Sequence, residues 1–444
     1  MYSVVLLTPI LQTLMTTTAD DLAKQAAFIR RRGKYTPAQF LQALTFGFLK
    51  RRGAPLEDLA QPLGISRQAL DKRLEKSTTA DFCRLCLLEA VKHLVDARPT
   101  LAPLLSRFNG AYLDDCTSVW LPDEASDDFP GTGGSDPNRG QARMKVLLRW
   151  EIQAGNVCHV GIHAGRTSDH DAEDLAPPLP KGALHLADLG FADFDRMQTE
   201  IEEGVYVLSR LPAQTRLYHD DDTDLPLSEQ LASWRKQGIK AVDMTASVGN
   251  KNQVAGRLVA LACPPDVVAR RLANLEKDAR HRGRPVSVRQ REMCHWTVLF
   301  SNIPSDWLNA EQLWILYRLR WQIELLFKRF KSEGGLAQSN SGKRYRVESE
   351  WYVKLLGQVI RNWMQLLRGG PLCDVNPVQL GRIITDHLYP IAEALRSGQG
   401  LEQALAKLER ELRKVRCRTA RRQRKTAAQI TAQELEQLVL TTLG

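Results

Sequence analysis

The stretch YRLRWQIELLFKRFK, residues 317–331, predicts one helix with two different faces. At ~100° per residue, its apolar side chains form a stripe that can pack on a core. Four polar residues form a second stripe about 60° wide, because they are spaced 3, 4 and 7 residues apart: Tyr317, Arg320, Glu324 and Lys331. We therefore expect an aromatic hydroxyl, two cations and one carboxylate to act side by side next to a core.

The composition favours a large folded protein with a polyanionic partner. A chain of 444 residues with 43% hydrophobic residues can bury substantial cores in two or three domains. The net charge of +10 suits nucleic acid, and it would also suit an acidic protein or an anionic lipid surface. Residues 1–100 hold 15 Lys and Arg against 9 Asp and Glu, and residues 401–444 hold 10 against 5. The middle of the chain is therefore nearly neutral and can hold functional acids.

The cysteines and the hydropathy pattern predict a cytoplasmic protein. Eight cysteines are scattered without framework spacing, and the sequence has no signal peptide and no apolar run of ~18 residues. We expect a reducing compartment and no membrane segment. Cys83 and Cys86 form one CxxC without a second ligand pair, so we interpret them as buried core thiols.

The first hundred residues have helical apolar spacing and contain a candidate helix-turn-helix. In PLEDLAQPLGISRQALDKRL, residues 55–74, Gly64 fits the turn and Ser66 fits the cap of a second helix. Side chains on the outer face of that helix could meet phosphates or base edges: Arg67, Gln68, Lys72 and Arg73. The alternative is an ordinary helical hairpin with a solvated, charged face.

From residue 110 the pattern changes to strands. Four apolar runs precede residue 200: AYLDDCTSVWLP, MKVLLRWEI, VCHVGIHAG and ALHLADLG. Three more lie between 204 and 304: GVYVLSRL, GRLVALAC and HWTVLFSNIP. A charged helical segment is expected over 265–293, and helices resume at 305. The tail over 413–425 has eight cations and predicts either a DNA-backbone arm or a solvated helix face.

Three acids stand where burial is costly unless a cation or metal compensates them. Asp115 lies within an apolar strand pattern, Asp188 ends another, and Glu324 lies on the two-faced helix. Phosphodiester chemistry on DNA can use two divalent ions about 3.5–4 Å apart, and such hard ions prefer carboxylate oxygens. Asp114 competes with Asp115, because neighbouring strand residues face opposite ways.

The sequence resembles the DDE transposases of the insertion sequence four family. Residues 317–331 match the spacing Y-x2-R-x3-E-x6-K of that family's signature. The blocks DDCTSVWLP, LADLGF and WTVLFSNIP are similar to its other blocks and occur in the same order. The resemblance is clear from about 110 to 365 and looser at both ends.

The resemblance implies an α+β protein with a ribonuclease-H-like (RNase-H-like) catalytic core, a β-rich insertion, and helical N-terminal and C-terminal domains. Asp115, Asp188 and Glu324 would ligate two Mg2+ ions, for which Mn2+ can substitute. Asp115 is preferred to Asp114 because the family's block is Asp, a small residue, then Thr. We expect these parts in order: a DNA-binding domain over 1–105, core over 106–200, insertion over 201–302, core helices over 303–365, and a basic region over 366–444.

The implied activity is cleavage of transposon ends and joining of their 3′-hydroxyls to target DNA. The partners would be double-stranded DNA and a second copy of the chain in a paired-end complex at the bacterial nucleoid. Tyr317, Arg320 and Lys331 would hold DNA phosphates. Trp296 would stack on an extruded base or, alternatively, face the core. Two further basic residues are weaker DNA-binding candidates: Lys328 and Arg210.

Two other functions are compatible with these patterns. The first is a noncatalytic, transposase-derived regulator that binds DNA through the helix-turn-helix and the basic tail. The second is a metal-dependent nuclease without strand transfer. The three acids and the four signature positions argue against the regulator.

Overall fold

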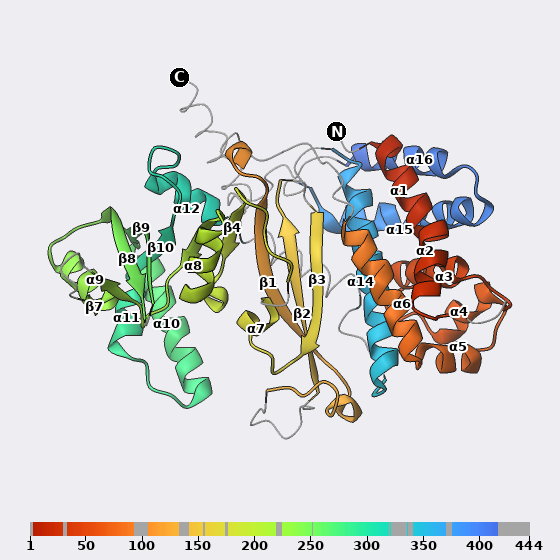
Figure 1. The fold of residues 1–444 in the computed structure, drawn as a ribbon, viewed down its shortest axis with the longest axis horizontal. Coiled ribbons are helices and arrows are strands. Elements are labelled where there is room, and N and C mark those ends of the chain that lie inside the picture. Colours follow the sequence, from red (N-terminus) through yellow and green to blue (C-terminus); the bar gives the residue numbers. More distant parts are fainter. Residues whose placement is uncertain are drawn as a thin grey trace. The chain divides into compact units, whose positions relative to one another are not determined.

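The computed structural model describes residues 3–29, 33–92, 105–132, 142–153, 156–173, 176–218, 224–250, 252–318, 320, 335, 341–369 and 375–415. The chain divides into two compact units. The first unit comprises Met1–Ala102, Asp115–Ala176 and Trp321–Gln433, and the second comprises Pro103–Asp114, Pro177–Arg320 and Glu434–Gly444. Both contain helices and strands (Figure 1), so the expected α+β class is confirmed.

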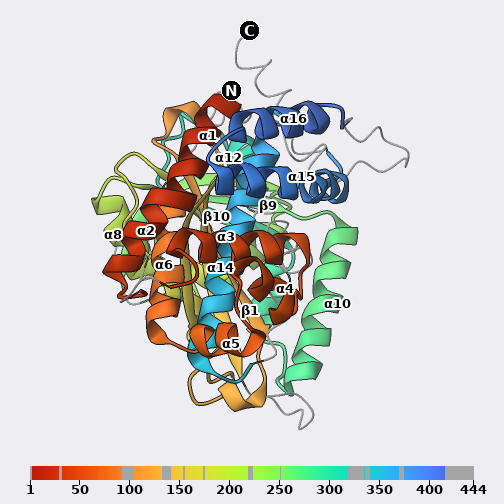
Figure 2. The same cartoon turned by 90° about the vertical axis from the view of Figure 1, so that its right-hand side faces the viewer.

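Helices dominate the first unit (Figure 2). The long helix α14 (Arg344–Leu366) packs against α6 (Ser77–Lys92) and α3 (Pro37–Lys50). Its two large side chains Trp351 and Trp363 are fully buried, which stabilises the packing of this helix. The other helices are α1 (Val4–Thr13), α2 (Ala19–Gln25), α4 (Leu56–Ala60), α5 (Arg67–Leu74), α7 (Asp169–Glu173), α15 (Pro377–Ser397) and α16 (Leu401–Arg413), with a π-helical stretch over Leu14–Thr18.

Local signals fix the starts of several of these helices. Thr36 and Gln39 form a reciprocal capping box at the start of α3. Gly64 takes the left-handed conformation, with φ of 64°, between α4 and α5. The Ser66 hydroxyl then accepts a hydrogen bond from the Ala69 amide at 3.2 Å and caps α5. The turn and the cap predicted from the sequence are therefore confirmed.

The strands of the first unit follow the order β3-β2-β1. Strand β2 (Arg143–Glu151) pairs antiparallel with β3 (Asn156–Ala164), with Val146 opposite Ile162. Nearly all of β2 is buried, including its charged residues Lys145, Arg149 and Glu151. Strand β1 (Ala111–Trp120) belongs to both units, because the boundary falls between Asp114 and Asp115.

The second unit continues from β1 in the order β1-β4-β5-β10-β9-β8-β6-β7. The pairs β1 with β4 (Leu184–Ala187) and β4 with β5 (Tyr206–Arg210) are parallel, and the later pairs are antiparallel. The later strands are β6 (Arg216–Tyr218), β7 (Asp224–Pro226), β8 (Ala241–Gly249), β9 (Gln253–Ala262) and β10 (Trp296–Ser301). Its α-helices are α8 (Phe194–Glu202), α9 (Leu227–Lys236), α10 (Pro265–Arg282), α11 (Val288–Met293) and α12 (Ala310–Arg318).

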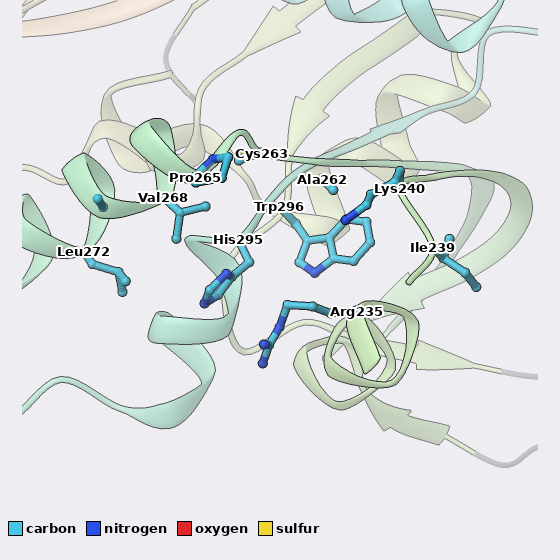
Figure 3. Close-up of a pocket in the computed structure, with 11 residues that line it drawn as sticks. Arg235, Ile239, Lys240, Ala262, Cys263, Pro265, Val268, Leu272, His295 and Trp296 are labelled. Atoms are coloured by element: carbon cyan, nitrogen blue, oxygen red, sulfur yellow. The ribbon is translucent and has the colours of Figure 1, made fainter. Parts of the chain in front are cut away.

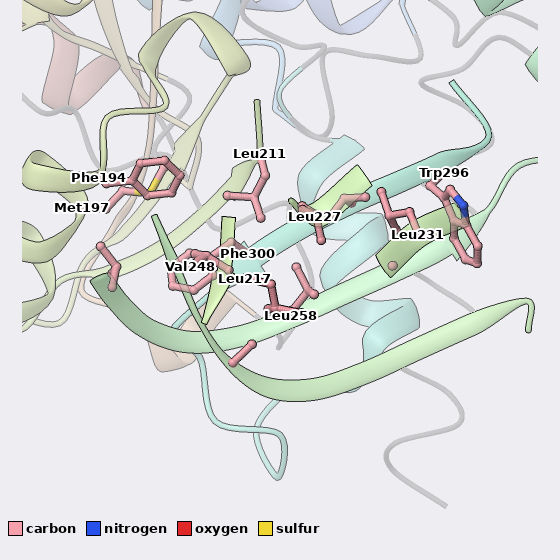
Figure 4. Close-up of a cluster of buried hydrophobic side chains, with 14 of the residues drawn as sticks. Phe194, Met197, Leu211, Leu217, Leu227, Leu231, Val248, Leu258, Trp296 and Phe300 are labelled. Carbon is pink, nitrogen blue, oxygen red and sulfur yellow. The ribbon is translucent and has the colours of Figure 1, made fainter. Parts of the chain in front are cut away.

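The later strands and α8, α9 enclose a hydrophobic core (Figure 4). Phe300 on β10 is fully buried there, and Trp296 at the start of the same strand packs edge-on against Trp234 of α9, with ring centroids 6.3 Å apart. Gly256 of β9 is needed for close packing, because an added Cβ would lie 2.5 Å from the Phe300 ring. This core, which we call the insertion core, lies largely within the segment over 201–302 that the sequence predicts as a β-rich insertion.

Most of the predicted strands and helices are present. The sequence did not predict β6, β7 or β8, because the first two are three residues long and most of β8 is not fully buried. The charged segment over 265–293 forms two helices, since α10 ends at Gly283 with φ of 60°. Cys83 and Cys86 are buried in α6, as expected. Among the described helices, none has the length and apolarity needed to cross a membrane.

Replacement of Phe300 tests the importance of the insertion core. Phe300→Ala removes a fully buried ring, so we expect a loss of about 3–5 kcal/mol in the free energy of unfolding, measured by urea titration. Val288→Ala removes methyl groups from a side chain that is 83% exposed and should change it by less than about 0.5 kcal/mol. Equal stability of the two variants would contradict the assignment of this core.

Candidate active site

Asp188 lies directly after β4 and begins the turn over Leu189–Phe191. Its side chain is 32% exposed. The Tyr317 hydroxyl donates a hydrogen bond to Asp188 Oδ1 at 3.1 Å, and Arg320 Nη1 lies 3.4 Å from Asp188 Oδ2. Two members of the polar stripe predicted from the sequence therefore meet one of the predicted acids.

Tyr317 is part of α12 and is only 6% exposed. Burial and the negative charge of Asp188 raise its pKa far above the ordinary value, against the opposing charges of Arg320 and Arg210. The phenol therefore keeps its proton at neutral pH and can donate a hydrogen bond to the carboxylate. The sequence predicted a phosphate contact for this hydroxyl, whereas the structure gives it a carboxylate partner.

Arg210 ends β5 and lies opposite Leu299 of β10. Its side chain is half-buried, and its charge is close enough to act on the pKa of Tyr317. Arg210, one of the two weaker basic candidates, therefore belongs to the same electrostatic environment as Asp188. Together with Arg320 it makes this part of the second unit favourable for anions.

The two neighbouring acids of β1 have different environments. Asp114 is fully buried, whereas Asp115 is half-buried. Asp115 Oδ1 accepts a hydrogen bond from the Cys116 amide at 2.8 Å. Since successive strand residues face opposite ways, only one of the two acids can face a shared site. Partial exposure favours Asp115 over Asp114 as an acid that exchanges ligands.

A partly buried ion pair lies near Asp115 within the first unit. Lys145 Nζ is 2.6 Å from Asp169 Oδ1, and both charges act on the Cys116 thiol. Burial, then the charge of Asp169, raises the pKa of Cys116 well above its ordinary value. The thiol therefore stays protonated and is a poor nucleophile or metal ligand.

A second set of buried charges lies beside Asp188 and was not predicted from the sequence. His185 of β4 is 1% exposed, with Nδ1 2.9 Å from Glu200 Oε2 and Nε2 3.7 Å from Asp114 Oδ2. Arg196 Nε donates to Glu200 Oε1 at 3.2 Å. These contacts join β1, β4 and α8 around the loop that begins with Asp188. We call this set the His185 network: Asp114, His185, Arg196 and Glu200.

Glu200 remains ionised in this network although it is buried. Burial alone would raise its pKa, but the charges of His185 and Arg196 and the hydrogen bond to His185 outweigh burial and hold the pKa below its ordinary value. The carboxylate therefore stabilises the fold through its charge, and the loop between β4 and α8 is fixed at both ends.

Trp296 lies in the core of the insertion and is 1% exposed, so its ring faces are not available to a base in this state. Its edge borders a cavity of about 370 Å³ that is also lined by Arg235, Lys240 and His295 (Figure 3). The indole nitrogen has no hydrogen-bond acceptor among the described residues. The core interpretation of Trp296 is therefore the one that matches its position, and its indole N–H is buried.

The predicted DNA-binding residues of α5 fall into two groups. Gln68 and Lys72 are exposed, and Arg67 is exposed while contacting Glu57 at 3.1 Å. Arg73 does not lie on the outer face as predicted. Its guanidinium lies 3.9 Å from the centre of the Phe28 ring and donates a hydrogen bond to the Phe28 carbonyl oxygen. Both residues belong to the first unit.

Glu324, Lys328 and Lys331 lie outside the described residues. Across the part of the chain that is described, no group of three or more His, Cys, Asp or Glu side chains could hold a metal ion. The described residues include only Asp115 and Asp188 of the three predicted acids, because Glu324 lies outside them.

Residues 115–359, more than half of the chain, match the family described as Transposase DDE domain. The chain belongs to this family. Its span begins at Asp115 and includes Asp188, Tyr317, Arg320 and Glu324. The expected family, and with it the function of a DNA transposase that depends on a divalent metal, is therefore confirmed. The strand order, β3-β2-β1 in the first unit and β1-β4-β5 in the second, is compatible with the RNase-H-like core that the sequence predicts.

Known transposases are similar over nearly the full chain. The transposase for insertion sequence element IS231F of Bacillus thuringiensis subsp. israelensis is 22% identical over 93% of this chain and 91% of its own length. The transposase for IS1151 of Clostridium perfringens is 24% identical over 82% of this chain and 81% of its own. A solved piggyBac transposase synaptic complex with hairpin DNA aligns with 93% of this chain and 80% of its own at a TM-score of 0.42 and 10% identity, which is too weak to support a conclusion.

The charge of Glu200 can be tested through the pH dependence of stability. Glu200→Gln should lower the free energy of unfolding by about 1–3 kcal/mol at pH 7, because His185 and Arg196 lose a charged partner. The folded-state pKa of Glu200 lies below 4.5, so the contribution is full above about pH 4.5 and is lost as the pH falls through the folded-state value. Urea titrations from pH 3 to 8 measure the difference.

Glu202→Gln is the matched control, since Glu202 is an exposed carboxylate two residues further along the same chain. It should leave stability nearly unchanged at every pH. A stability difference for Glu200→Gln that did not depend on pH would show that shape, and not charge, explains the contribution of Glu200.

Proposed function

We propose that Asp115, Asp188 and Glu324 hold two Mg2+ ions and that the transposase cuts transposon ends and joins their 3′-hydroxyls to target DNA. The observation that carries the proposal is the Asp188 carboxylate, which lies at a strand end beside Tyr317 and Arg320 in the matched part of the chain. When bound, the ions would supply an activated water or hydroxyl and a stabilised leaving oxygen.

The donor set suits Mg2+. All three side chains are carboxylates, which hard divalent ions prefer, and magnesium keeps several waters, so few protein ligands suffice. Asp188 is partly exposed, so part of its carboxylate is open to a ligand from solvent. Asp115 is half-buried, and its carboxylate accepts one backbone amide.

The DNA contacts that we propose come from the signature and from α5. Arg320 and Lys331 would hold phosphates beside the reacting bond, with weaker contributions from Lys328 and Arg210. Arg67, Gln68 and Lys72 would contact DNA from the exposed face of α5, and we leave out Arg73 because its guanidinium binds Phe28. Two copies of the chain would act on paired ends, since both ends must be cut together.

The decisive experiment uses a labelled duplex that carries the element's own end, with Mg2+, and compares the unchanged protein with Glu324→Gln. The variant removes one charge with little change of shape, so we expect DNA binding within about twofold and cleavage reduced by at least about 10³-fold. Gel separation of products measures cleavage, and a mobility shift measures binding.

The outcomes separate the candidate functions. Joining of the cut 3′ end to a second duplex identifies the transposase reaction, whereas cutting without joining identifies a nuclease. Specific binding without cutting by either protein would identify a regulator. Asp115→Asn and Asp114→Asn distinguish the acids, since the former should remove cleavage from a stable protein and the latter should destabilise the fold.

Trp296→Phe tests whether the indole contributes to base extrusion. We propose that the indole of Trp296, which borders the cavity, contacts an extruded base at the transposon end. A 2-aminopurine reporter at the transposon end should brighten on binding to the unchanged protein and brighten less with Trp296→Phe. Identical brightening, together with a lower melting temperature of the variant, would leave only the core role.

A further inference from the structure

Helix α10 is anchored in its first half and extends away from the strands of the second unit in its second half (Figure 1). The Arg271 guanidinium donates hydrogen bonds to the Trp296 carbonyl oxygen at 2.7 Å and to Thr297 Oγ1 at 3.0 Å, both on β10. Beyond Leu272, which lines the cavity beside Trp296, the described side chains of α10 are exposed or only half-buried. Core packing therefore does not account for the last turns of this helix.

Local signals fix the turn that follows α10. The helix ends at Gly283, which takes the left-handed conformation with φ of 60°. Helix α11 then begins with a reciprocal capping box at Ser287. Arg291 of α11 pairs with Glu276 of α10, with Nη1 2.9 Å from Oε1. We call residues 265–293 the α10–α11 hairpin. Its side chains project from a fixed backbone, as a preformed binding surface requires.

The hairpin carries more positive than negative charge. Residues 264–295 contain eight Lys and Arg against four Asp and Glu. Two of these acids already have cation partners, since Glu276 pairs with Arg291 and Glu292 accepts two hydrogen bonds from Arg235 of α9. Five exposed cations have no carboxylate partner among the described residues: Arg270, Lys277, Arg280, Arg284 and Arg289. The potential at the hairpin is therefore positive.

Two shallow depressions on the hairpin meet at Arg280. The first lies on α10 and has four charged or titratable residues: Lys277, Asp278, Arg280 and His281. The second, of about 400 Å³, lies between α10 and the turn and has four charged residues: Glu276, Arg280, Arg284 and Arg291.

The shared arginine makes one surface of the two depressions. Lys277, Arg280 and Arg284 are three and four residues apart, which is the spacing of one helix face. We call these three residues the hairpin cation surface. Seven residues of helix cover about 10 Å, and one DNA strand places about three phosphates along that length.

The base of the hairpin lies beside the candidate active site within the second unit. Cys294 directly follows α11, and burial raises the pKa of its thiol against the lowering charges of arginines that include Arg210. Arg210 also acts on the pKa of Tyr317, whose hydroxyl donates a hydrogen bond to Asp188. The charge of Arg210 therefore reaches both the hairpin base and the Asp188 site. A duplex engaged at Asp188 is longer than that site, so its backbone can meet neighbouring surfaces.

We propose that the hairpin cation surface binds the phosphate backbone of duplex DNA without reading its sequence, and so holds DNA that extends beyond the candidate active site. The inference rests on the proposed function, because it takes DNA engaged at Asp188 as the substrate. Exposed Lys and Arg side chains neutralise phosphates whatever the base sequence. A transposon end and a target duplex offer the same phosphates, and the experiment separates these two sources.

The experiment removes two neighbouring charges from the full-length protein. Arg280→Gln combined with Arg284→Gln keeps both side chains polar, and both positions are exposed, so the melting temperature should not change. Affinity for a labelled duplex is measured in EDTA over a series of KCl concentrations. We expect weaker binding, and a slope of log affinity against log salt that is shallower by about 2, one for each lost phosphate contact.

Two arms identify which DNA the surface holds. In the first arm, the labelled duplex carries the transposon end. In the second arm, the protein is saturated with unlabelled ends and the labelled duplex has an unrelated sequence. A shallower slope in the first arm assigns the hairpin cation surface to the transposon end, and one in the second arm assigns it to target DNA. Slopes equal to those of the unchanged protein in both arms would overturn the inference.

Lys181→Gln combined with Lys236→Gln is the matched control, because both lysines are exposed cations of the second unit outside the hairpin. It removes the same net charge and should leave both slopes unchanged. An equal change in this control would show that net charge, and not the hairpin, determines the slope, and would also overturn the inference. If the unchanged protein binds the transposon end no more tightly than an unrelated duplex, the proposed function fails. The slope for the unrelated duplex then still decides whether the hairpin binds DNA.

Discussion

The parallel pairing of β1 with β4 is the constraint on which the candidate site of the second unit depends. It places Tyr112 opposite His185, so Asp114 and His185 lie on the same face of neighbouring strands. Their proximity, together with Glu200 from α8, gives three buried ionisable groups partners that they could not find alone. Because His185 precedes Asp188 by three residues and Glu200 follows the same loop, the network also fixes the backbone from which Asp188 projects.

The acids of this region offset the free-energy cost of burial in two ways. Asp114 and Glu200 are nearly inaccessible and have partners on fixed secondary structure, so removing either partner leaves a charge that water cannot reach. Asp188 is one-third exposed, and its charged partner sits on a long side chain beyond a helix end. Of these three acids, Asp188 therefore has the most side-chain surface open to solvent, while the His185 network fixes the backbone that precedes and follows it.

Much of the fold was predictable because its signals are local. The strand around Asp115, the end of β4 before Asp188 and the cap at Ser66 each follow from a few neighbouring residues. The His185 network was not predictable, because His185 and Glu200 are 15 residues apart and meet only through the register of β4 and the packing of α8. Arg73 was placed on the wrong side because helical spacing does not reveal that Phe28, 45 residues earlier, lies beside it. Trp296 illustrates the same limit, since an aromatic residue at a strand start can face a core or a ligand with the same local sequence.

The spacing of three residues between Tyr317 and Arg320 explains why they reach the same carboxylate. Side chains three apart lie on one face of a helix, so both can approach Asp188, one from within α12 and one from just beyond its end. The sequence pattern predicts that these groups act together but not which anion they bind, because an arginine recognises a carboxylate and a phosphate with the same donors. A mixed stripe of cations and one acid therefore describes a site in which protein carboxylates and DNA phosphates compete for the same partners. Under the proposed function, a bound divalent ion would favour DNA in that competition, because it would neutralise the carboxylates.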